Sequence, residues 1–331
     1  MTRLYVRWSG YRSVLGPGIQ RYLQAKRALG RRFANEERAL RLLDRFLTGR
    51  SVSSIAQITT PLLDAFLCSR PRPCSRSYNH LLGIVRRLLE WLVLQGIPGV
   101  APYRGRPRRE TGRRIPVIFT DAQVTRLLDA AARLEDGTRA RLRGPIYRTL
   151  FAILYGLGLR VGEASRLELG DVDLERGLLW VRRTKFGKDR LVPFGPRLGS
   201  AIHAYLAHRR KAGFSSVPAA PLFTVDGRSA VSTNSIRRVF HQLVREAGSP
   251  VSASGSPARV HDFRHTFAVS TLLQWYRQKI RPGDRLHHLS TFLGHVNVRA
   301  TAIYLTITSE LLDEANRRFA ALASATLAGG V

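Results

Sequence analysis

Four segments between residues 156 and 304 hold the side chains whose types and spacing could carry chemistry. In chain order they contain Arg160, then Lys185 with Lys188, then His261, Arg264 and His265, and finally His295 and Tyr304. Guanidinium, ammonium and imidazole groups stabilise negative charge or transfer protons, and a tyrosine hydroxyl can act as a nucleophile. Taken singly, each segment also has an ordinary structural explanation, such as a helix cap, a solvated turn or a buried aromatic ring.

The run His261-Asp262-Phe263-Arg264-His265 is the densest of these segments. Positions i, i+3 and i+4 of a helix share a face, so His261, Arg264 and His265 are expected to cluster. Two histidines four residues apart also suggest a zinc protease. That pattern needs a glutamate after the first histidine, where this chain has the shorter Asp262, and the cation of Arg264 would disfavour a metal ion. We therefore expect no metal here.

The charge of the chain indicates the kind of partner on which these groups act. Among the 331 residues, 54 are Lys or Arg and 23 are Asp or Glu, which gives a formal net charge of +31. Such a surplus attracts polyanions, and nucleic acid is the expected one. Arginine is spread along the chain rather than concentrated on one amphipathic helix, which argues against a membrane-surface role.

The composition excludes several other classes of protein. Hydrophobic residues make up 44%, too many for a wholly disordered basic chain. No run approaches 18 uncharged apolar residues, and the first residues lack the apolar core of a secretory signal. Cys68 and Cys74 are the only cysteines, too few for a disulfide framework. We expect a cytoplasmic bacterial protein, associated with the nucleoid and without a membrane partner.

The elements that must position the chemistry are mostly helices. Apolar periodicity and capping signals predict helices at 38–47, 61–67, 77–95, 145–157, 197–212, 233–247 and 260–275, and another that opens at the capping box of Thr120 and Gln123. Two strands, 178–183 and 190–194, flank a turn that carries Lys185 and Lys188. The predicted fold class is mainly α with a small antiparallel β-sheet.

Residues 98–116 interrupt this pattern with four prolines and six arginines. Proline forbids a helix there, so the segment is expected to be an extended basic linker that lies along a DNA backbone. The predicted domains are therefore 1–98, a linker at 99–116, and 117–331. The residues expected to contact DNA are Arg104, Arg106, Arg108, Arg109, Arg113, Arg114 and Lys188.

As an ordered set, the chemical segments resemble the tyrosine recombinase family, which includes phage integrases and Xer-like proteins. The matching pieces are Gly158-Leu159-Arg160-Val161-Gly162-Glu163, Lys185 upstream of Arg190-Leu191-Val192-Pro193, His261-Asp262-Phe263-Arg264-His265, Leu293-Gly294-His295 and Tyr304. The resemblance covers nearly the whole chain. It implies a two-domain, C-shaped clamp on DNA, with a helical core-binding domain and an α+β catalytic domain that opens near residue 115.

The resemblance also implies an enzyme that cuts and rejoins DNA strands without a metal or nucleotide cofactor. The Tyr304 hydroxyl would attack the scissile phosphate, which gives a 3′-phosphotyrosine and a free 5′-hydroxyl. Arg160 and Arg264 would clamp the phosphate, because a guanidinium forks two donors and stays charged. A later strand attack reverses the step, so no ATP is needed.

The remaining residues receive their roles from the same resemblance. Ionising a free tyrosine at pH 7 costs about 4 kcal/mol, and His261 is the family's candidate base. Lys185 is the expected general acid for the departing 5′ oxygen, and His295 would hydrogen-bond a phosphate oxygen. Glu163 and His265 are expected to hold the catalytic side chains in position without contacting the DNA themselves.

The chain departs from the family pattern in two places. The glycines that usually flank the hairpin lysine are absent, so Lys188 stays a second candidate acid. The distance in sequence to Leu191-Val192-Pro193 favours Lys185. The chain from Arg264 to His295 is longer than the family norm by about two helical turns, with residues 281–284 expected as a turn. A tail helix near 308–323 is expected either to pack on its own domain or to dock on a neighbouring protomer.

Several functions remain open at this stage. The leading one is a site-specific recombinase or integrase of a mobile element. It is expected to act on double-stranded DNA as a tetramer, formed either by copies of this chain or together with related recombinases. A type IB topoisomerase shares the chemistry but relaxes supercoils as a monomer, and a Xer-like protein resolves replicon dimers. A DNA-binding protein with a vestigial site is the least expected, because every catalytic position of the family is filled.

The charge predicts how DNA affinity depends on salt. Many phosphates neutralised by Lys and Arg release counterions, so the logarithm of the binding constant should fall steeply and linearly with the logarithm of the salt concentration. Filter binding or fluorescence anisotropy with a DNA duplex at several salt concentrations measures the slope. A flat response would contradict the expected set of arginine contacts.

Overall fold

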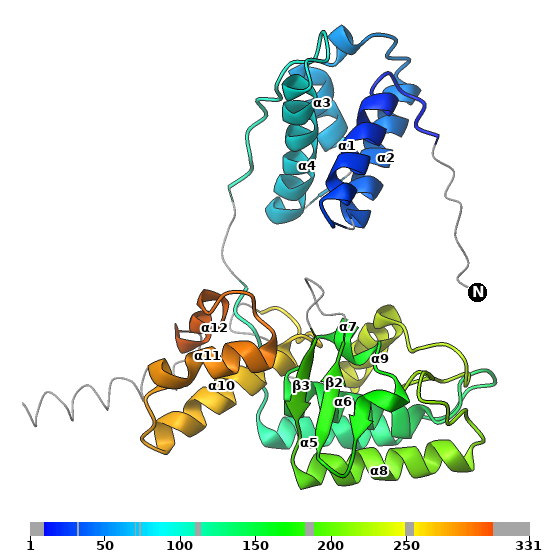
Figure 1. Ribbon diagram of the computed structural model, residues 1–331, viewed down its shortest axis with the longest axis vertical. Helices are drawn as coiled ribbons and strands as arrows, with labels where there is room; N and C mark the ends of the chain where they lie inside the picture. The colour runs from blue at the N-terminus through cyan, green and yellow to red at the C-terminus, as the bar shows by residue number, and fades with distance from the viewer. Residues whose placement is uncertain are drawn as a thin grey trace, which may run out of the picture. The chain divides into compact units, whose positions relative to one another are not determined.

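Figure 1 shows the computed structural model, which describes residues 10–31, 33–69, 71–72, 74–109, 114–182, 189–248 and 255–306. The chain divides into two compact units, Met1–Arg113 and Arg114–Val331. Helices dominate the described residues of both units, as the sequence predicts. Of the described helices, none is long and apolar enough to cross a membrane.

The first unit is a helical domain. Its elements are α1 (Gly16–Ala28), α2 (Ala34–Gly49), the 3-10 turn η1 (Ile55–Gln57), α3 (Thr60–Cys68) and α4 (Ser75–Leu94). The apolar stripes that predicted α2 and α4 form much of the core: Leu40, Leu43, Leu47, Leu81, Val85, Leu88, Leu89 and Leu92 are all buried. Periodic burial of this kind stabilises the unit through removal of apolar surface from water.

Helix α1 has no counterpart among the predicted elements. It begins at Gly16-Pro17-Gly18, which is typical of a turn. Proline is nevertheless well accommodated in the first turn of a helix, because its missing N–H would have no intrahelical partner there. Gly18 is buried against Leu92 of α4, where a Cβ would lie 2.8 Å from a leucine methyl group, so the glycine permits close packing of the two helices.

Much of the segment predicted as an extended linker packs against the first unit. Tyr103 is buried in the core of that unit, and its hydroxyl donates to Asp64 of α3. Asn79 of α4 exchanges two 2.8 Å hydrogen bonds with the backbone of Arg108. The Arg108 guanidinium lies 3.9 Å from the centre of the Tyr78 ring. The two compact units divide between Arg113 and Arg114, within the predicted linker at 99–116.

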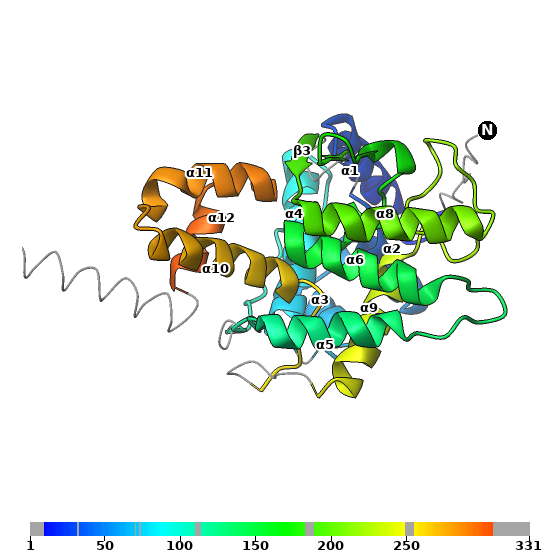
Figure 2. The same ribbon diagram turned by 90° about the horizontal axis from the view of Figure 1, so that it is seen from below.

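The second unit packs its helices around a large apolar core. Its helices are α5 (Asp121–Ala132), α6 (Arg143–Leu157), α7 (Val161–Ala164), α8 (Pro196–Lys211), α9 (Thr233–Glu246), α10 (Asp262–Arg277), α11 (Pro282–Leu293) and α12 (Arg299–Ala302), with 3-10 turns η2 (Leu169–Asp171) and η3 (Ile303–Thr306). Helix α6 is central, and Figure 2 shows it between α5 and α8. The predicted capping box opens α5, because Thr120 accepts from the Gln123 backbone and the Gln123 side chain accepts in return.

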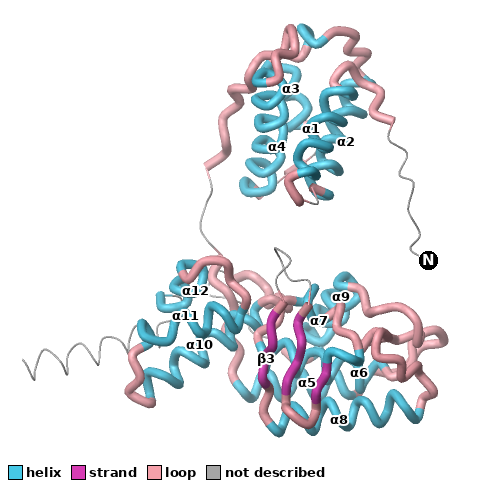
Figure 3. The backbone as a smooth tube through the Cα atoms, in the orientation of Figure 1, coloured by secondary structure: helices cyan, strands magenta, loops and turns pink. Residues whose placement is uncertain are grey.

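The described strands form one small antiparallel sheet, shown in magenta in Figure 3. The predicted hairpin is β2 (Leu178–Val181) with β3 (Arg190–Pro193), and Leu179 pairs with Val192. A third strand, β1 (Val172–Asp173), adds to the edge of β2. Two residues are too short for a recognisable period-2 pattern, so the sequence did not predict β1. The lysines of the turn lie outside the described residues.

Helices α10, α11 and α12 gather at one end of the second unit (Figure 1). The prediction of a turn at residues 281–284 is wrong, because α11 begins there with Pro282 in its first turn. A proline-glycine pair reads as a turn, yet proline also suits the first helical position. The predicted tail helix near 308–323 lies outside the described residues.

A buried ion pair fixes the start of α10 to the start of the second unit. The Arg114 guanidinium donates to both carboxylate oxygens of Asp262, at 2.9 and 2.7 Å, and also to the Pro257 carbonyl. Asp262 has no exposed surface and also accepts from the Arg259 backbone. Arg114 was expected to contact DNA; in the structure its guanidinium is engaged by the protein.

This ion pair predicts a loss of stability on substitution. Arg114→Ala leaves the Asp262 carboxylate buried without its cation, and breaking such a pair typically costs about 3 kcal/mol of unfolding free energy. Urea unfolding at pH 7 measures the change. Arg126→Ala, which removes an exposed arginine of α5, is the matched control and should change little. A loss below about 1 kcal/mol for Arg114→Ala would contradict this role.

Candidate active site

A tight turn between two helices presents Arg160. Helix α6 ends at Leu157, and Gly158 follows in the left-handed conformation with φ 56°. A Cβ on Gly158 would lie 2.8 Å from the Phe267 ring, so glycine is required both for this backbone conformation and for the close approach of α10. Arg160 then caps α7 with extended backbone. The turn thus aims Arg160 toward α10 and α11.

Arg160 and Arg264 converge on the end of α11. Arg264, which is 1% exposed, donates to the carbonyls of Gly158 at 2.7 Å and Leu293 at 2.6 Å. Arg160 donates to the carbonyl of Gly294 at 2.9 Å. Burial, and then the charge of Arg160, lower the pKa of Arg264 to about 10, so the group still carries its charge at pH 7. The two predicted clamp residues therefore lie together.

A carboxylate connects Arg160 to the sheet. Glu163 accepts from the Arg160 backbone at 3.0 Å and from its guanidinium at 2.8 Å. It also accepts from the guanidinium of Arg190 at 2.9 Å. Burial alone would raise the pKa of Glu163, but the hydrogen bonds and charges of Arg190 and Arg160 lower it to about 2. Glu163 therefore holds Arg160 and joins it to Arg190 of β3.

Arg190 is a residue that the sequence reasoning missed. It begins β3, and its Nε donates to the Phe292 carbonyl at 2.8 Å while its other nitrogens bind Glu163. The guanidinium thus joins the sheet, Glu163 and the end of α11. A Cβ on Gly294 would lie 2.8 Å from Arg190, so glycine at 294 leaves room for this contact. The sequence signal was Arg190-Leu191-Val192-Pro193, read only as a marker of spacing.

Tyr304 lies within this group of cations. Its side chain is 4% exposed, and its hydroxyl lies 3.1 Å from Nδ1 of His265. Burial raises the pKa of Tyr304, whereas the positive charges of Arg264 and Arg160 lower it. The tyrosine therefore faces the two arginines, as a nucleophile that attacks a clamped phosphate requires.

His295 follows α11 and contacts the segment that carries Tyr304. Its Nδ1 lies 2.7 Å from the hydroxyl oxygen of Thr301, a fully buried residue of α12. The His295 and Tyr304 rings are nearly parallel, with centres 6.3 Å apart. Burial, followed by the charges of Arg264 and Arg160, lowers the pKa of His295 to about 4, so the ring is neutral at pH 7. No sequence pattern indicates the role of Thr301.

His261 occupies a more exposed position. It precedes α10 as its N-terminal cap residue, and its ring meets that of His265 edge-on at 4.8 Å. Loss of hydration lowers the pKa of His261 most, followed by the repulsion that two protonated rings, His261 and His265, would exert on each other, and then by the charge of Arg264. The predicted cluster of His261, Arg264 and His265 is thus present, but His265 is the histidine that contacts the Tyr304 hydroxyl.

The remaining predicted residues belong to the first unit or lie outside the described residues. Arg104, Arg106 and Arg109 are exposed on the first unit. Arg113, Lys185 and Lys188 lie outside the described residues. Within the described ranges, no three His, Cys, Asp or Glu side chains are grouped so that they could hold a metal ion.

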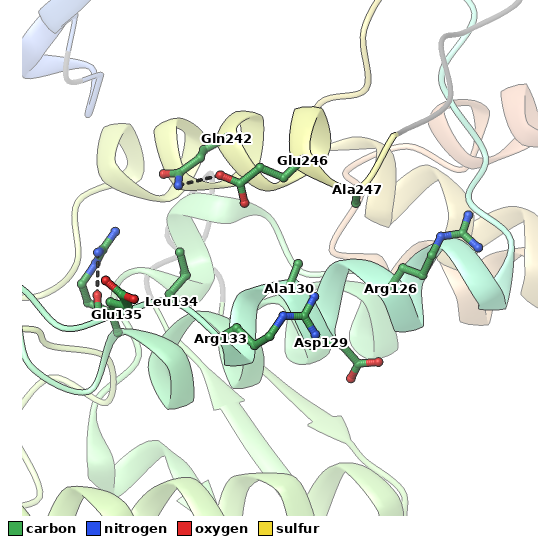
Figure 4. Close-up of a pocket in the computed structure, with 10 residues that line it drawn as sticks. Arg126, Asp129, Ala130, Arg133, Leu134, Glu135, Gln242, Glu246 and Ala247 are labelled. Atoms are coloured by element: carbon green, nitrogen blue, oxygen red, sulfur yellow. Dashed lines mark hydrogen bonds between the residues drawn. The ribbon is translucent and has the colours of Figure 1, made fainter.

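A separate pocket of about 640 Å³ lies between α5 and α9 (Figure 4). Three arginines and three carboxylates line it: Arg126, Arg133, Arg143, Asp129, Glu135 and Glu246. Glu246 accepts from Gln242 at 2.9 Å, and Arg143 donates to the Glu135 carbonyl. The charges balance, and none of these residues belongs to the cluster around Tyr304.

The low pKa of Glu163 predicts how its contribution to stability depends on pH. Because the folded-state pKa is about 2 and the ordinary value is 4.5, the carboxylate stabilises the fold above pH 4.5, and this stabilisation is lost as the pH falls toward 2. The difference in unfolding free energy between wild type and Glu163→Gln should therefore shrink by about 2 kcal/mol from pH 6 to pH 3.

Chemical denaturation at several pH values measures this difference. Glu175→Gln, at an exposed glutamate of the same unit, is the control and should track the wild type throughout. A Glu163→Gln difference that stays constant over this range, or grows as the pH falls, would contradict the ion-pair network.

Comparison with known proteins shows the family to which this chain belongs. The model of the phage integrase family matches residues 118–310. The integrase/recombinase y4rB of Sinorhizobium fredii is 34% identical over 92% of this chain and 97% of its own length. The tyrosine recombinase XerA of Thermococcus kodakarensis is 32% identical, over 71% of this chain and 73% of its own.

Solved structures share the fold at lower sequence identity. An integrase of the transposon Tn1549 in complex with transposon right end DNA is 18% identical, with a TM-score of 0.65 over 92% of this chain and 99% of that one. A lambda integrase tetramer bound to a Holliday junction is 16% identical, with a TM-score of 0.61 over 89% and 78% of the two chains. With the family match and the arrangement of Arg160, Arg264, His295 and Tyr304, the conclusion follows that this chain is a tyrosine recombinase of the phage integrase family, a DNA breaking-rejoining enzyme.

Proposed function

We propose that this recombinase cleaves and rejoins DNA at specific sites through a 3′-phosphotyrosine formed on Tyr304. The observation that carries the proposal is that Arg160 and Arg264 meet at the carbonyls that end α11, while Tyr304 lies beside these arginines and stacks near His295. Such a convergence of cations around one hydroxyl suits a phosphate that gains negative charge during attack.

Each side chain has a role in the proposed step. Arg160 and Arg264 bind the non-bridging oxygens of the phosphate, and Glu163 orients Arg160 from behind. His295 is neutral at pH 7, so it can donate one hydrogen bond to a phosphate oxygen from the nitrogen that does not face Thr301. Lys185, which lies between β2 and β3 in the sequence, protonates the departing 5′ oxygen, with Lys188 as the alternative.

The proposed partner is double-stranded DNA, bound by four copies of this chain in a synaptic complex. The net charge of +31 and the exposed arginines of the first unit support the DNA contact. The lambda integrase tetramer on a Holliday junction and the Tn1549 integrase on transposon end DNA have the same fold and support the assembly by analogy. The integrase of the transposon Tn1549, which has the same fold, supports a role in a mobile element by analogy.

The nucleophile assignment predicts the behaviour of one conservative variant. Tyr304→Phe removes only the hydroxyl, so it should keep DNA affinity within about twofold while it abolishes covalent adduct formation. A nicked substrate whose product diffuses away traps the adduct of the wild type, and a denaturing gel detects it. An adduct formed by Tyr304→Phe would refute the assignment.

A paired assay separates recombination from topoisomerase activity. A plasmid with two copies of the target site should be resolved or inverted, and both products require synapsis of two duplexes. Efficient relaxation of supercoiled DNA at low protein concentration, without recombinant products, would instead support a type IB topoisomerase.

A further inference from the structure

We propose that His265, rather than His261, accepts the proton of the Tyr304 hydroxyl when that hydroxyl attacks DNA. The assignment depends on the proposed function, in which Tyr304 is the nucleophile, and it identifies the base of that same site. His265 qualifies as a catalytic residue because it touches the reacting oxygen itself.

The contact between the two side chains is direct. Nδ1 of His265 lies 3.1 Å from the Tyr304 hydroxyl oxygen, within hydrogen-bond distance, and the ring centres are 5.4 Å apart at 59°. Tyr304 is 4% exposed. A hydroxyl buried to this extent has little access to bulk water, so its proton needs an acceptor within the protein.

The position of His261 suits a different task. It is an exposed residue that immediately precedes α10, and its ring contacts that of His265. Among the described residues, no hydrogen bond joins His261 to Tyr304. An exposed imidazole beside the arginine clamp can instead contact a non-bridging oxygen of the incoming phosphate.

The surrounding charges explain why a separate proton acceptor is required. Arg264 and Arg160 stabilise the negative charge that develops on the Tyr304 oxygen. A guanidinium, however, has no lone pair available for a proton and can only donate hydrogen bonds. The arginines therefore favour the phenolate, while the imidazole in contact with the hydroxyl removes the proton.

The proposed step is balanced in atoms and electrons. The O–H bond of Tyr304 breaks, and an N–H bond forms at Nδ1 of His265, whose neutral ring carries its other hydrogen on Nε2. The oxygen electron pair forms the new O–P bond, and the P–O5′ bond breaks with its pair on the 5′ oxygen. That oxygen takes a proton from the general acid, Lys185 or its alternative Lys188. In the rejoining step His265 returns its proton to Tyr304.

Two DNA substrates distinguish a base from an acid. One is unmodified DNA, the oxygen substrate. In the other, the sulfur substrate, the scissile 5′ oxygen is replaced by sulfur, which leaves as a thiolate and needs no proton. Single-turnover adduct formation by His265→Ala should be slower by about a hundredfold or more on both substrates, because loss of the base affects both. Lys185→Ala, the matched control, should be slow on the oxygen substrate and restored on the sulfur substrate.

A conservative variant separates proton transfer from positioning. The amide oxygen of His265→Asn can accept a hydrogen bond near the place of Nδ1 but takes up no proton at pH 7. His265→Asn should therefore be as slow as His265→Ala, and it alone decides the question if His265→Ala fails to fold. His261→Ala should remain faster than either variant on the sulfur substrate.

Three results would overturn the proposal. They are recovery of His265→Ala on the sulfur substrate, recovery by His265→Asn, and a His265→Ala rate within about threefold of wild type. Wild type that forms no adduct on either substrate would instead contradict the proposed function, so the two failures are distinguishable.

Discussion

Two guanidinium groups must lie together, largely out of water, and both must keep their charge. Arg160 and Arg264 repel one another, and burial of Arg264 adds a cost that lowers its pKa to about 10. Backbone carbonyls of Gly158, Leu293 and Gly294 offset this cost by accepting their hydrogen bonds. Glu163 supplies one negative charge against the three guanidinium groups of Arg160, Arg190 and Arg264, and carbonyl dipoles compensate only part of the rest, so the site favours an anion such as a phosphodiester.

Several other residues of the second unit hold these two arginines in place. Gly158 turns the chain so that Arg160 reaches the carbonyl of Gly294 at the end of α11, and Glu163 also binds that arginine. Arg190 then ties Glu163 to the sheet and to the end of α11. The short segment with Thr301 and Tyr304 completes the ring of side chains through His295 and His265.

Local rules predicted most of the helices and the chemical residue types. Leu81, Val85 and Leu88 repeat at helical spacing, and the Thr120–Gln123 capping box marks a helix start. The same rules failed at Pro17 and Pro282, where a proline that resembles a turn signal begins a helix. Strand β1 was not predicted, because its two residues form a strand only by pairing with β2 in the folded sheet.

The site was predictable as a set of residues but not as a set of contacts. Nothing in the spacing of Arg190 indicates that it binds Glu163, and nothing near Thr301 indicates a hydrogen bond to His295. The resemblance to the family assigned the base to His261, whereas the fold brings His265 to Tyr304. Partners from α7, β3, α10 and α12 meet only in the tertiary structure, so a single sequence does not reveal them.

The central claim is that a DNA phosphate is attacked within the ring of Arg160, Arg264, His295 and Tyr304. The most direct measurement is mass spectrometry of the covalent complex after digestion with protease and nuclease. The account predicts a nucleotide mass on the phenolic oxygen of Tyr304, joined through a 3′-phosphate. A nucleotide on any other residue, or joined through a 5′-phosphate, would contradict it.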